Sequence, residues 1–208
     1  MKILITFFEH SGTRFLVNFL SRTGLDNKIS HENARYEINV SWMDAPNWAQ
    51  AEKVIHLVRH PLSICKTYMR NSTYYKSHSN WWERNLKPHI DLNQYPFKPE
   101  TAWQRILTAW ADWNEMIERC PKLVWRFRIE DILNSELLTA KTLVSILGGD
   151  INRIELYKLP EQLAGFKGAH PTNDYPRTYE ELAEKDLKVA ERIKNMAIRY
   201  GYGPGGIE

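Results

Sequence analysis

The chain has 208 residues, of which 43% are hydrophobic and 25% are charged, and these values are typical of one globular domain. Its net charge of +3 and its pI near 8.8 suit an anionic ligand but fall short of the basic footprint of a nucleic-acid-binding protein. Two cysteines exclude a disulfide framework, and no apolar run is long enough to span a membrane, so we expect a cytoplasmic protein without membrane or nucleic-acid partners.

An apolar segment, a short polar loop and an amphipathic segment open the chain. We expect residues 2–8 to form a buried strand and residues 12–23 to form a helix that ends near Gly24. The loop Ser11-Gly12-Thr13 then directs backbone N–H groups and a helix N-terminus at one point, which suits a phosphate group. The alternative is an ordinary helix N-cap, because Ser and Thr are favoured there. The loop lacks the pattern Gly-x-x-x-x-Gly-Lys-Ser/Thr, which disfavours an ATP or GTP hydrolase.

A second apolar segment also ends in a polar turn and leads into a helix. Residues 25–50 are predicted as mixed loop with short strands, residues 53–58 as a strand and residues 61–72 as a helix. Arg59 follows the strand and Thr67 lies on the helix. A guanidinium fork and a hydroxyl group near a strand end favour a second phosphate site. The alternative interpretation is a surface ion pair for Arg59 and a neutral surface position for Thr67.

The middle of the chain combines an irregular segment with a helix. Residues 73–99 contain three prolines and many aromatic side chains, which predicts a long loop, and such loops are often functional. Trp81 and Trp82 in this loop are candidates for a wall of the substrate site. Residues 100–119 are predicted to be helical. The tryptophans of this helix are expected to pack in the core, and they are Trp103, Trp110 and Trp113.

The last part of the chain continues the alternation of strands and helices. Residues 123–128 are predicted as a strand, residues 135–147 as a helix and residues 178–200 as one long helix. This alternation predicts an α/β fold with three layers, α/β/α, in which helices cover a central parallel sheet. Residues 1–208 are interpreted as a single domain. Ligands of such sheets bind at the carboxyl ends of the strands, where both candidate phosphate loops lie.

Three motifs, taken in this order, resemble those of the sulfotransferases that use 3'-phosphoadenosine 5'-phosphosulfate (PAPS). The motifs are His10–Leu16, Arg59-His60-Pro61 with Thr67, and Val124–Leu133. In that family the first motif binds the 5'-phosphosulfate and the second binds the 3'-phosphate. The resemblance covers roughly residues 1–135 and implies a P-loop NTPase-like sulfotransferase fold. It also implies that the protein is a nucleotide-binding transferase that uses PAPS as its co-substrate and needs no metal.

Carried over to this chain, the resemblance implies a cofactor site built from several segments. The site comprises His10, Ser11, Gly12, Thr13, Arg14, Phe15, Arg59 and Thr67, with Lys167 and Arg177 in a C-terminal basic loop. His10 departs from the family, which has Lys or Arg there. It can stabilise charge on the leaving oxygen, a catalytic role, only while its ring is protonated. Arg14 is a second candidate for that positive charge, and Thr67 keeps the hydroxyl of the family's Ser.

A sulfuryl acceptor also needs a base that removes its proton. The Trp-x-x-His pattern of one branch of the family is absent, because residues 103–106 read Trp-Gln-Arg-Ile. His31-Glu32 followed by Ser41-Trp42 resembles a bacterial-type pattern, which implies Glu32 as the base and His31 as its competitor. The alternative is that both are ordinary surface-loop residues. The expected acceptor is a hydroxyl or amine of a small molecule or glycan. The pattern identifies neither the acceptor nor the oligomeric state.

Two other classes of protein stay open. One is a P-loop-like nucleotide or small-molecule kinase, and the other is a non-catalytic nucleotide- or nucleic-acid-binding module on the same fold. Magnesium dependence would distinguish the kinase, and steep salt dependence of DNA binding would distinguish the module. The acids Glu130 and Asp131 are interpreted as helix-start residues with a structural role. The histidines show no metal-ligand spacing.

Overall fold

The computed structural model describes residues 2–9, 11–70, 102–134, 137–154 and 175–204. The chain divides into two compact units. The first comprises Met1–Arg59 and Met116–Leu163, and we call it the sheet unit. The second comprises His60–Glu115 and Ala164–Glu208, and we call it the helical unit. Each unit is described by itself, and the single domain over residues 1–208 stays a prediction.

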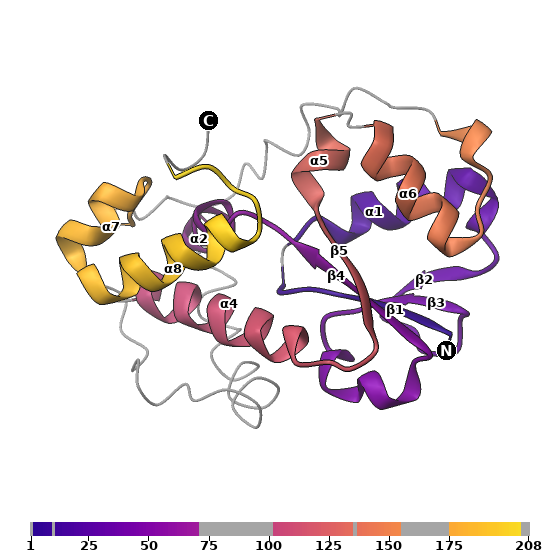
Figure 1. The fold of residues 1–208 in the computed structure, drawn as a ribbon, viewed down its shortest axis with the longest axis horizontal. Coiled ribbons are helices and arrows are strands. Elements are labelled where there is room, and N and C mark those ends of the chain that lie inside the picture. Colours follow the sequence, from indigo (N-terminus) through magenta and orange to yellow (C-terminus); the bar gives the residue numbers. More distant parts are fainter. Residues whose placement is uncertain (1, 10, 71–101, 135–136, 155–174, 205–208) are drawn as a thin grey trace. The chain divides into compact units, whose positions relative to one another are not determined.

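A parallel sheet organises the sheet unit. Its strands are β1 (Ile3–Thr6), β2 (Ile29–His31), β3 (Ile38–Val40), β4 (Lys53–Val58) and β5 (Leu123–Arg128). They form a five-stranded sheet in the order β2-β3-β1-β4-β5, and every neighbouring pair is parallel (Figure 1). The chain therefore starts in the centre of the sheet, adds two strands on one side and then adds two on the other. This confirms the predicted α/β fold with a parallel sheet.

Helices flank this sheet. They are α1 (Thr13–Leu20), which continues into a π-helical turn η1 (Ser21–Leu25), the 3-10 helix η2 (Ala45–Gln50), α5 (Ile129–Leu133), α6 (Leu137–Leu147) and the short η5 (Ile151–Arg153). Figure 1 shows α1, α5 and α6 on one side of the sheet and η2 on the other. The sheet is thus an inner layer, which explains why most residues of β1, β3 and β4 are buried on both faces.

Strand register determines which side chains share a face of the sheet. Ile5 pairs with Val40 on one side and with Ile55 on the other, and all three side chains are fully buried. Leu4 points to the opposite face, because side chains alternate along a strand. There it packs in a buried cluster with Ala51, next to η2. Burial on both faces is the main source of free energy that stabilises this unit.

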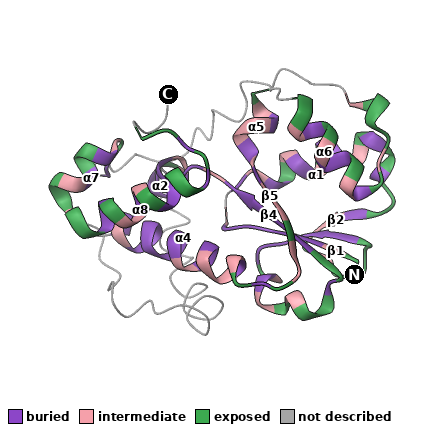
Figure 2. Ribbon diagram, viewed as in Figure 1, coloured by how far each residue is buried: buried purple, intermediate pink, exposed green. Residues whose placement is uncertain are grey.

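The helical unit contains α2 (Pro61–Arg70), most of α4 (Ala102–Glu118), α7 (Tyr179–Lys185) and α8 (Leu187–Arg199). Trp110 is fully buried and meets Tyr200 edge to face, with 5.8 Å between ring centroids. Arg192 of α8 donates to Asp112 at 2.5 Å and to Glu115 at 3.1 Å, so charged groups also link α8 to α4. Figure 2 shows buried and exposed residues alternating along α8, as expected of an amphipathic helix.

The predicted elements agree with the structure in most places. The strands at residues 53–58 and 123–128 and the buried tryptophans of α4 are confirmed. The single helix over residues 178–200 is wrong, because Asp186 ends α7 and begins α8. Its carboxylate accepts a hydrogen bond from the Val189 N–H at 3.1 Å, as an N-cap does. The irregular segment at residues 73–99 lies outside the described residues.

None of the helices that the structure describes is long and apolar enough to cross a membrane. The same part of the chain holds no cluster of three or more His, Cys, Asp or Glu side chains that could bind a metal ion. Because several segments lie outside the described residues, the predicted absence of a metal stays a prediction.

Candidate active site

One edge of the sheet collects most of the predicted site residues. All five strands are parallel, so the residues that follow them lie along a common carboxyl edge. Ser11–Thr13 follow β1, Glu32 follows β2, Ser41–Asp44 follow β3, and Arg59 follows β4. The carboxyl ends of parallel strands are where ligands bind in folds of this kind. The topology therefore brings the first candidate phosphate loop, Arg59 of the second candidate site and the candidate base to the same edge of the sheet unit.

The loop after β1 approaches the start of α5 closely. Gly12 has φ of 85°, a left-handed conformation that favours glycine. A Cβ atom at this position would lie 3.0 Å from Cγ1 of Ile129, so a side chain would also crowd α5. Gly12 is the N-cap of α1, no described side chain caps that helix, and its first turn contains no acidic residue. The open amide groups and the positive end of the helix dipole fit a phosphate or sulfate group.

Ser11 and Thr13 use their hydroxyl groups differently. The Ser11 side chain is buried, and its Oγ donates to the carbonyl oxygen of Phe8 at 2.5 Å. This bond closes the loop on itself, so we expect Ser11 to offer an anion its backbone N–H rather than its hydroxyl. Thr13 Oγ1 instead lies 3.1 Å from Nε2 of His31. Thr13 thus links the loop after β1 to the end of β2.

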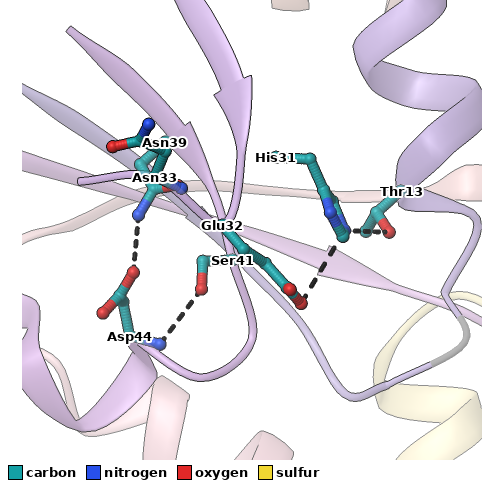
Figure 3. A network of polar contacts seen from close by, with 7 residues as sticks. All are labelled: Thr13, His31, Glu32, Asn33, Asn39, Ser41 and Asp44. Carbon is teal, nitrogen blue, oxygen red and sulfur yellow. Dashed lines mark hydrogen bonds and ion pairs between the residues drawn. The ribbon is translucent and has the colours of Figure 1, made fainter. Parts of the chain in front are cut away.

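His31 and Glu32 lie beside Thr13, as Figure 3 shows. Nε2 of His31 is 3.8 Å from Oε1 of Glu32, and the two side chains are 32% and 29% exposed. The same ring nitrogen therefore faces a hydroxyl and a carboxylate. Sequence analysis predicted one base and one competitor at these positions, and the structure brings both residues to Thr13. Partial exposure leaves the carboxylate accessible from solvent.

A buried polar network supports the end of β2. Asn39 of β3 is fully buried, and its Oδ1 accepts from the N–H of Asn33 at 2.9 Å. Its Nδ2 donates to Oδ2 of Asp44 at 2.6 Å, and the Asp44 N–H donates to Oγ of Ser41 at 3.2 Å (Figure 3). Neither Asn39 nor Asp44 is among the site residues predicted from the sequence. The signal was present, because an Asn between two apolar residues of a strand is disfavoured without a partner.

The predicted 3'-phosphate residues belong to different units. Arg59 is half-buried at the carboxyl end of β4 in the sheet unit, and Thr67 lies on α2 in the helical unit. Thr67 Oγ1 donates to the Ser63 carbonyl oxygen at 2.8 Å, which is the usual contact of a helical threonine. Its oxygen lone pairs stay available, but its proton must turn away from Ser63 to reach a ligand. The joint role of Arg59 and Thr67 stays a prediction.

His60, between the motif residues Arg59 and Pro61, has a structural environment. Its Nδ1 accepts from the Leu62 N–H at 3.2 Å, and its Nε2 lies 3.2 Å from the hydroxyl of Tyr179. Burial lowers the pKa of His60 from 6.5 to about 4. The ring is therefore neutral at physiological pH, with its proton on Nε2. His60 connects the start of α2 to α7 within the helical unit.

Buried polar contacts also join β4 and β5. His56 of β4 is fully buried, and its Nδ1 accepts from Nε of Arg126 at 3.2 Å. Arg126 also donates to Oε1 of Glu118 at 2.7 Å. Farther along β5, Nε of Arg128 donates to Oδ1 of Asp131 at 2.7 Å. This ion pair gives Asp131 the structural role that sequence analysis favoured.

The remaining predicted residues divide into two groups. Arg14 is exposed on the first turn of α1, and Phe15 stacks on Phe19 with ring centroids 6.3 Å apart. Arg177 is exposed in the helical unit, and its guanidinium carbon lies 5.9 Å from the centroid of the Tyr175 ring. The predicted residues that lie outside the described part of the chain are His10, Trp81, Trp82 and Lys167.

Fold and site together define the class of protein. The chain is an α/β protein with a parallel sheet, a tight glycine-containing loop after its central strand, and a Thr–His–Glu group at the carboxyl edge. It is similar in structure to the sulfotransferase domain from the curacin biosynthetic pathway, with a TM-score of 0.52 and 12% sequence identity. The match covers 97% of this chain and 98% of that one, and it shows a shared fold. No family model and no curated protein matches the chain.

Proposed function

We propose that this chain transfers a sulfuryl group from PAPS to a hydroxyl or amine of a small molecule or carbohydrate. The observation that carries this proposal is the Thr13–His31–Glu32 group, in which an uncapped helix start lies beside a carboxylate. An anion site and a base are the two elements that this transfer needs. The sulfotransferase fold of the structural neighbour supports the same chemistry in general.

The loop after β1 fits the 5' end of PAPS. Gly12 allows close backbone approach, the first turn of α1 offers amide groups, and Thr13 adds a hydroxyl. When bound, PAPS supplies an activated sulfuryl group on its 5'-phosphate. Arg59 and Thr67 are proposed to hold the 3'-phosphate, with Lys167 and Arg177 closing over it. A guanidinium suits this task because its donor fork matches two phosphate oxygens.

Glu32 is proposed to remove the proton of the acceptor. Its carboxylate is partly exposed and lies at the same edge as the loop after β1, so an acceptor can reach both. His31 faces this carboxylate and Thr13 through one nitrogen. We therefore assign His31 to orienting Glu32 and Thr13, with a role as base if Glu32 is dispensable. General-base catalysis of this kind contributes typically 100- to 10,000-fold to the rate, on the order of a few kcal/mol.

Negative charge on the departing 5'-phosphate needs stabilisation as the sulfuryl group leaves. Backbone amides at the start of α1 are preorganised for this, because no described side chain occupies them. Arg14 carries a permanent positive charge on the exposed side of the same turn. His10 is proposed to add a second charge when its ring is protonated. Replacing His10 by Lys should then extend activity to alkaline pH, and identical pH profiles would remove His10 from the mechanism.

The first test is a thermal-shift titration with 3'-phosphoadenosine 5'-phosphate against ADP and AMP. Saturation at about 100 times the dissociation constant adds about 2.7 kcal/mol of stability, which is roughly 5–10 °C for a chain of this size. We expect this shift for the 3'-phosphorylated nucleotide alone, and we expect Arg59→Ala to abolish it. An equal shift with ADP would contradict the PAPS assignment.

Transfer itself is tested with labelled PAPS and a panel of small alcohols, amines and sugars. The proposed reaction needs no metal, so label should reach an acceptor in the presence of EDTA. Transfer of phosphate from ATP that depends on magnesium would instead favour the kinase alternative. Nucleotide binding without any transfer, across the whole panel and in both conditions, would favour a non-catalytic binding module.

A further inference from the structure

Glu32 has a backbone conformation that a glutamate rarely adopts. Its φ is 57°, and among the described residues it is the one residue other than glycine with a positive φ. A side chain in this left-handed region is strained by contact between Cβ and the backbone. Strain of this kind persists only where surrounding contacts impose it, and it is concentrated at functional sites.

Hydrogen bonds to the neighbouring strand β3 hold the backbone at Glu32 and at the residue after it. Its own N–H donates to the carbonyl oxygen of Val40 at 3.1 Å, which continues the ladder between β2 and β3. The next N–H, that of Asn33, donates to the Asn39 side chain at 2.9 Å. The residue immediately after Glu32 is therefore bound to a side chain of the neighbouring strand and not to its backbone. The backbone turns between these two bonds, and the turn carries the positive φ.

The Asn39 amide is itself fixed in orientation. Asn39 is fully buried, and Asp44 accepts from its Nδ2 at 2.6 Å, a charge-assisted bond. The Asp44 N–H in turn donates to Ser41 Oγ at 3.2 Å. Because an amide has an acceptor on one side and a donor on the other, this arrangement determines which atom faces Asn33. A carboxylate at position 39 would face Asp44 with like charge, and an apolar residue would offer no acceptor.

We propose that Asn39 is a positioning residue that holds Glu32 in its left-handed conformation and so directs its carboxylate toward His31 and Thr13. The inference rests on the proposed function, in which Glu32 removes the acceptor's proton. The hydrogen bond between Asn33 and Asn39 explains two features that local residue preferences disfavour. One is the positive φ of Glu32, and the other is a buried Asn within a strand. Asp44 and Ser41 act through Asn39.

A thermal melting experiment tests whether Asn39 holds the backbone conformation of Glu32, without any assay of activity. Glycine tolerates a positive φ and alanine does not, so Glu32→Gly should melt higher than Glu32→Ala, by roughly 2–4 °C. In an Asn39→Leu background the turn is released, and this advantage should vanish or reverse. The matched control is Lys28, an exposed turn residue whose φ is not positive, where Gly should melt no higher than Ala in either background. An equal advantage of Gly at position 32 in both backgrounds would overturn the proposal.

Where Asn39→Leu does not fold, Asp44→Ala replaces it, because loss of the Asp44 carboxylate frees the Asn39 amide to turn. The same comparison of Gly with Ala at position 32 is then made in that background. A smaller Gly advantage supports the proposal. An unchanged advantage overturns it, because the amide orientation would then have no influence on Glu32.

Steady-state kinetics tests the link to the reaction. Asn39→Leu should lower kcat by about 10- to 100-fold with KM for PAPS unchanged, since the loop after β1 is untouched. The double variant with Glu32→Ala should be no slower than Glu32→Ala alone. Additive losses would overturn the positioning role while leaving the proposed function intact. If Glu32→Ala retains full activity, the proposed base is wrong, and the melting comparison still decides whether Asn39 holds the turn.

Discussion

The hydroxyl of Thr13 lies 3.1 Å from Nε2 of His31, so the first turn of α1 and the end of β2 meet through side chains. Glu32 extends this group, since its carboxylate is 3.8 Å from the same nitrogen. The arrangement places a candidate anion site beside a candidate base.

Removal of the Thr13 hydroxyl should damage catalysis more than folding. Thr13→Val keeps the shape of the side chain but loses the contact to His31 and the donor to a phosphate oxygen. We expect kcat/KM to fall by about 100-fold, as for loss of one donor in an oxyanion site. Thr13→Ser retains the hydroxyl and serves as the control. Similar kinetics for Val and Ser would show that the hydroxyl has no part in the reaction.

Replacement of the Glu32 carboxylate should affect the chemical step. Glu32→Gln keeps the size and loses the base, so kcat should fall by about 100- to 10,000-fold. Affinity for 3'-phosphoadenosine 5'-phosphate, measured by thermal shift, should stay within a factor of about two, because the loop after β1 is unchanged. The parallel variant His31→Gln separates the two candidates. A larger loss of kcat in His31→Gln than in Glu32→Gln would make His31 the base.

The glycine before α1 should not tolerate a side chain. Gly12→Ala combines a positive φ with a Cβ that lies 3.0 Å from Ile129, and we expect a loss of about 2–3 kcal/mol. Gly148 isolates the first effect, because its φ is 74° and no atom lies within 4 Å of its added Cβ. Gly148→Ala should therefore cost about 1–2 kcal/mol. Urea unfolding of both variants measures the difference, and equal losses would exclude crowding at Ile129.

Stability should decrease on acidification through His60. The pKa of this ring is lowered from 6.5 to about 4 by burial, so the unfolded chain binds its proton first as pH falls. The contribution is complete above pH 6.5 and is lost as pH falls toward 4, by about 3 kcal/mol in total. Tyr179 and Tyr202 pack against the ring, and neither offers it a negative charge at these pH values.

The control for this pH effect is His60→Gln, which has no charge to gain. Its free energy of unfolding, measured in urea at steps between pH 7 and pH 4, should fall less steeply than that of the native chain. Parallel curves for the two proteins would show that His60 is protonated equally in the folded and unfolded states, contrary to its burial.

The break between α7 and α8 should depend on one cap. Asp186 accepts from the Val189 N–H at 3.1 Å and from Nε2 of Gln104 at 2.8 Å. Asp186→Ala should lower the free energy of unfolding by about 1–2 kcal/mol, through loss of the cap and of the contact to α4. Asp186→Asn keeps an acceptor for the Val189 N–H but replaces Oδ2, which accepts from Gln104, with a donor nitrogen. It should therefore recover the part of the loss that comes from the cap, as read from urea midpoints. No recovery by Asn would indicate that charge, rather than capping, matters there.

Local patterns were sufficient for much of the fold. The apolar runs at residues 53–58 and 123–128 were predicted as strands, and the structure has strands at the same residues. Strand positions within residues 25–50 were harder to predict, because β2 and β3 have three residues each and show no clear alternation of apolar and polar residues. The extent of α5 was not predicted for a similar reason, since five residues are too few to show a helical period. Its start was indicated, because Glu130 and Asp131 were interpreted as helix-start residues and lie in its first turn.

The amino-acid sequence alone determined the alternation of strands and helices and the glycine at the start of α1, because hydrophobic period and backbone sterics act over a few residues. Only the tertiary structure decided that Thr13 meets His31, 18 residues away, and that Asn39 holds the turn after Glu32. Those contacts depend on strand order and register. The order β2-β3-β1 is set by packing of the whole sheet, and no local pattern contains it.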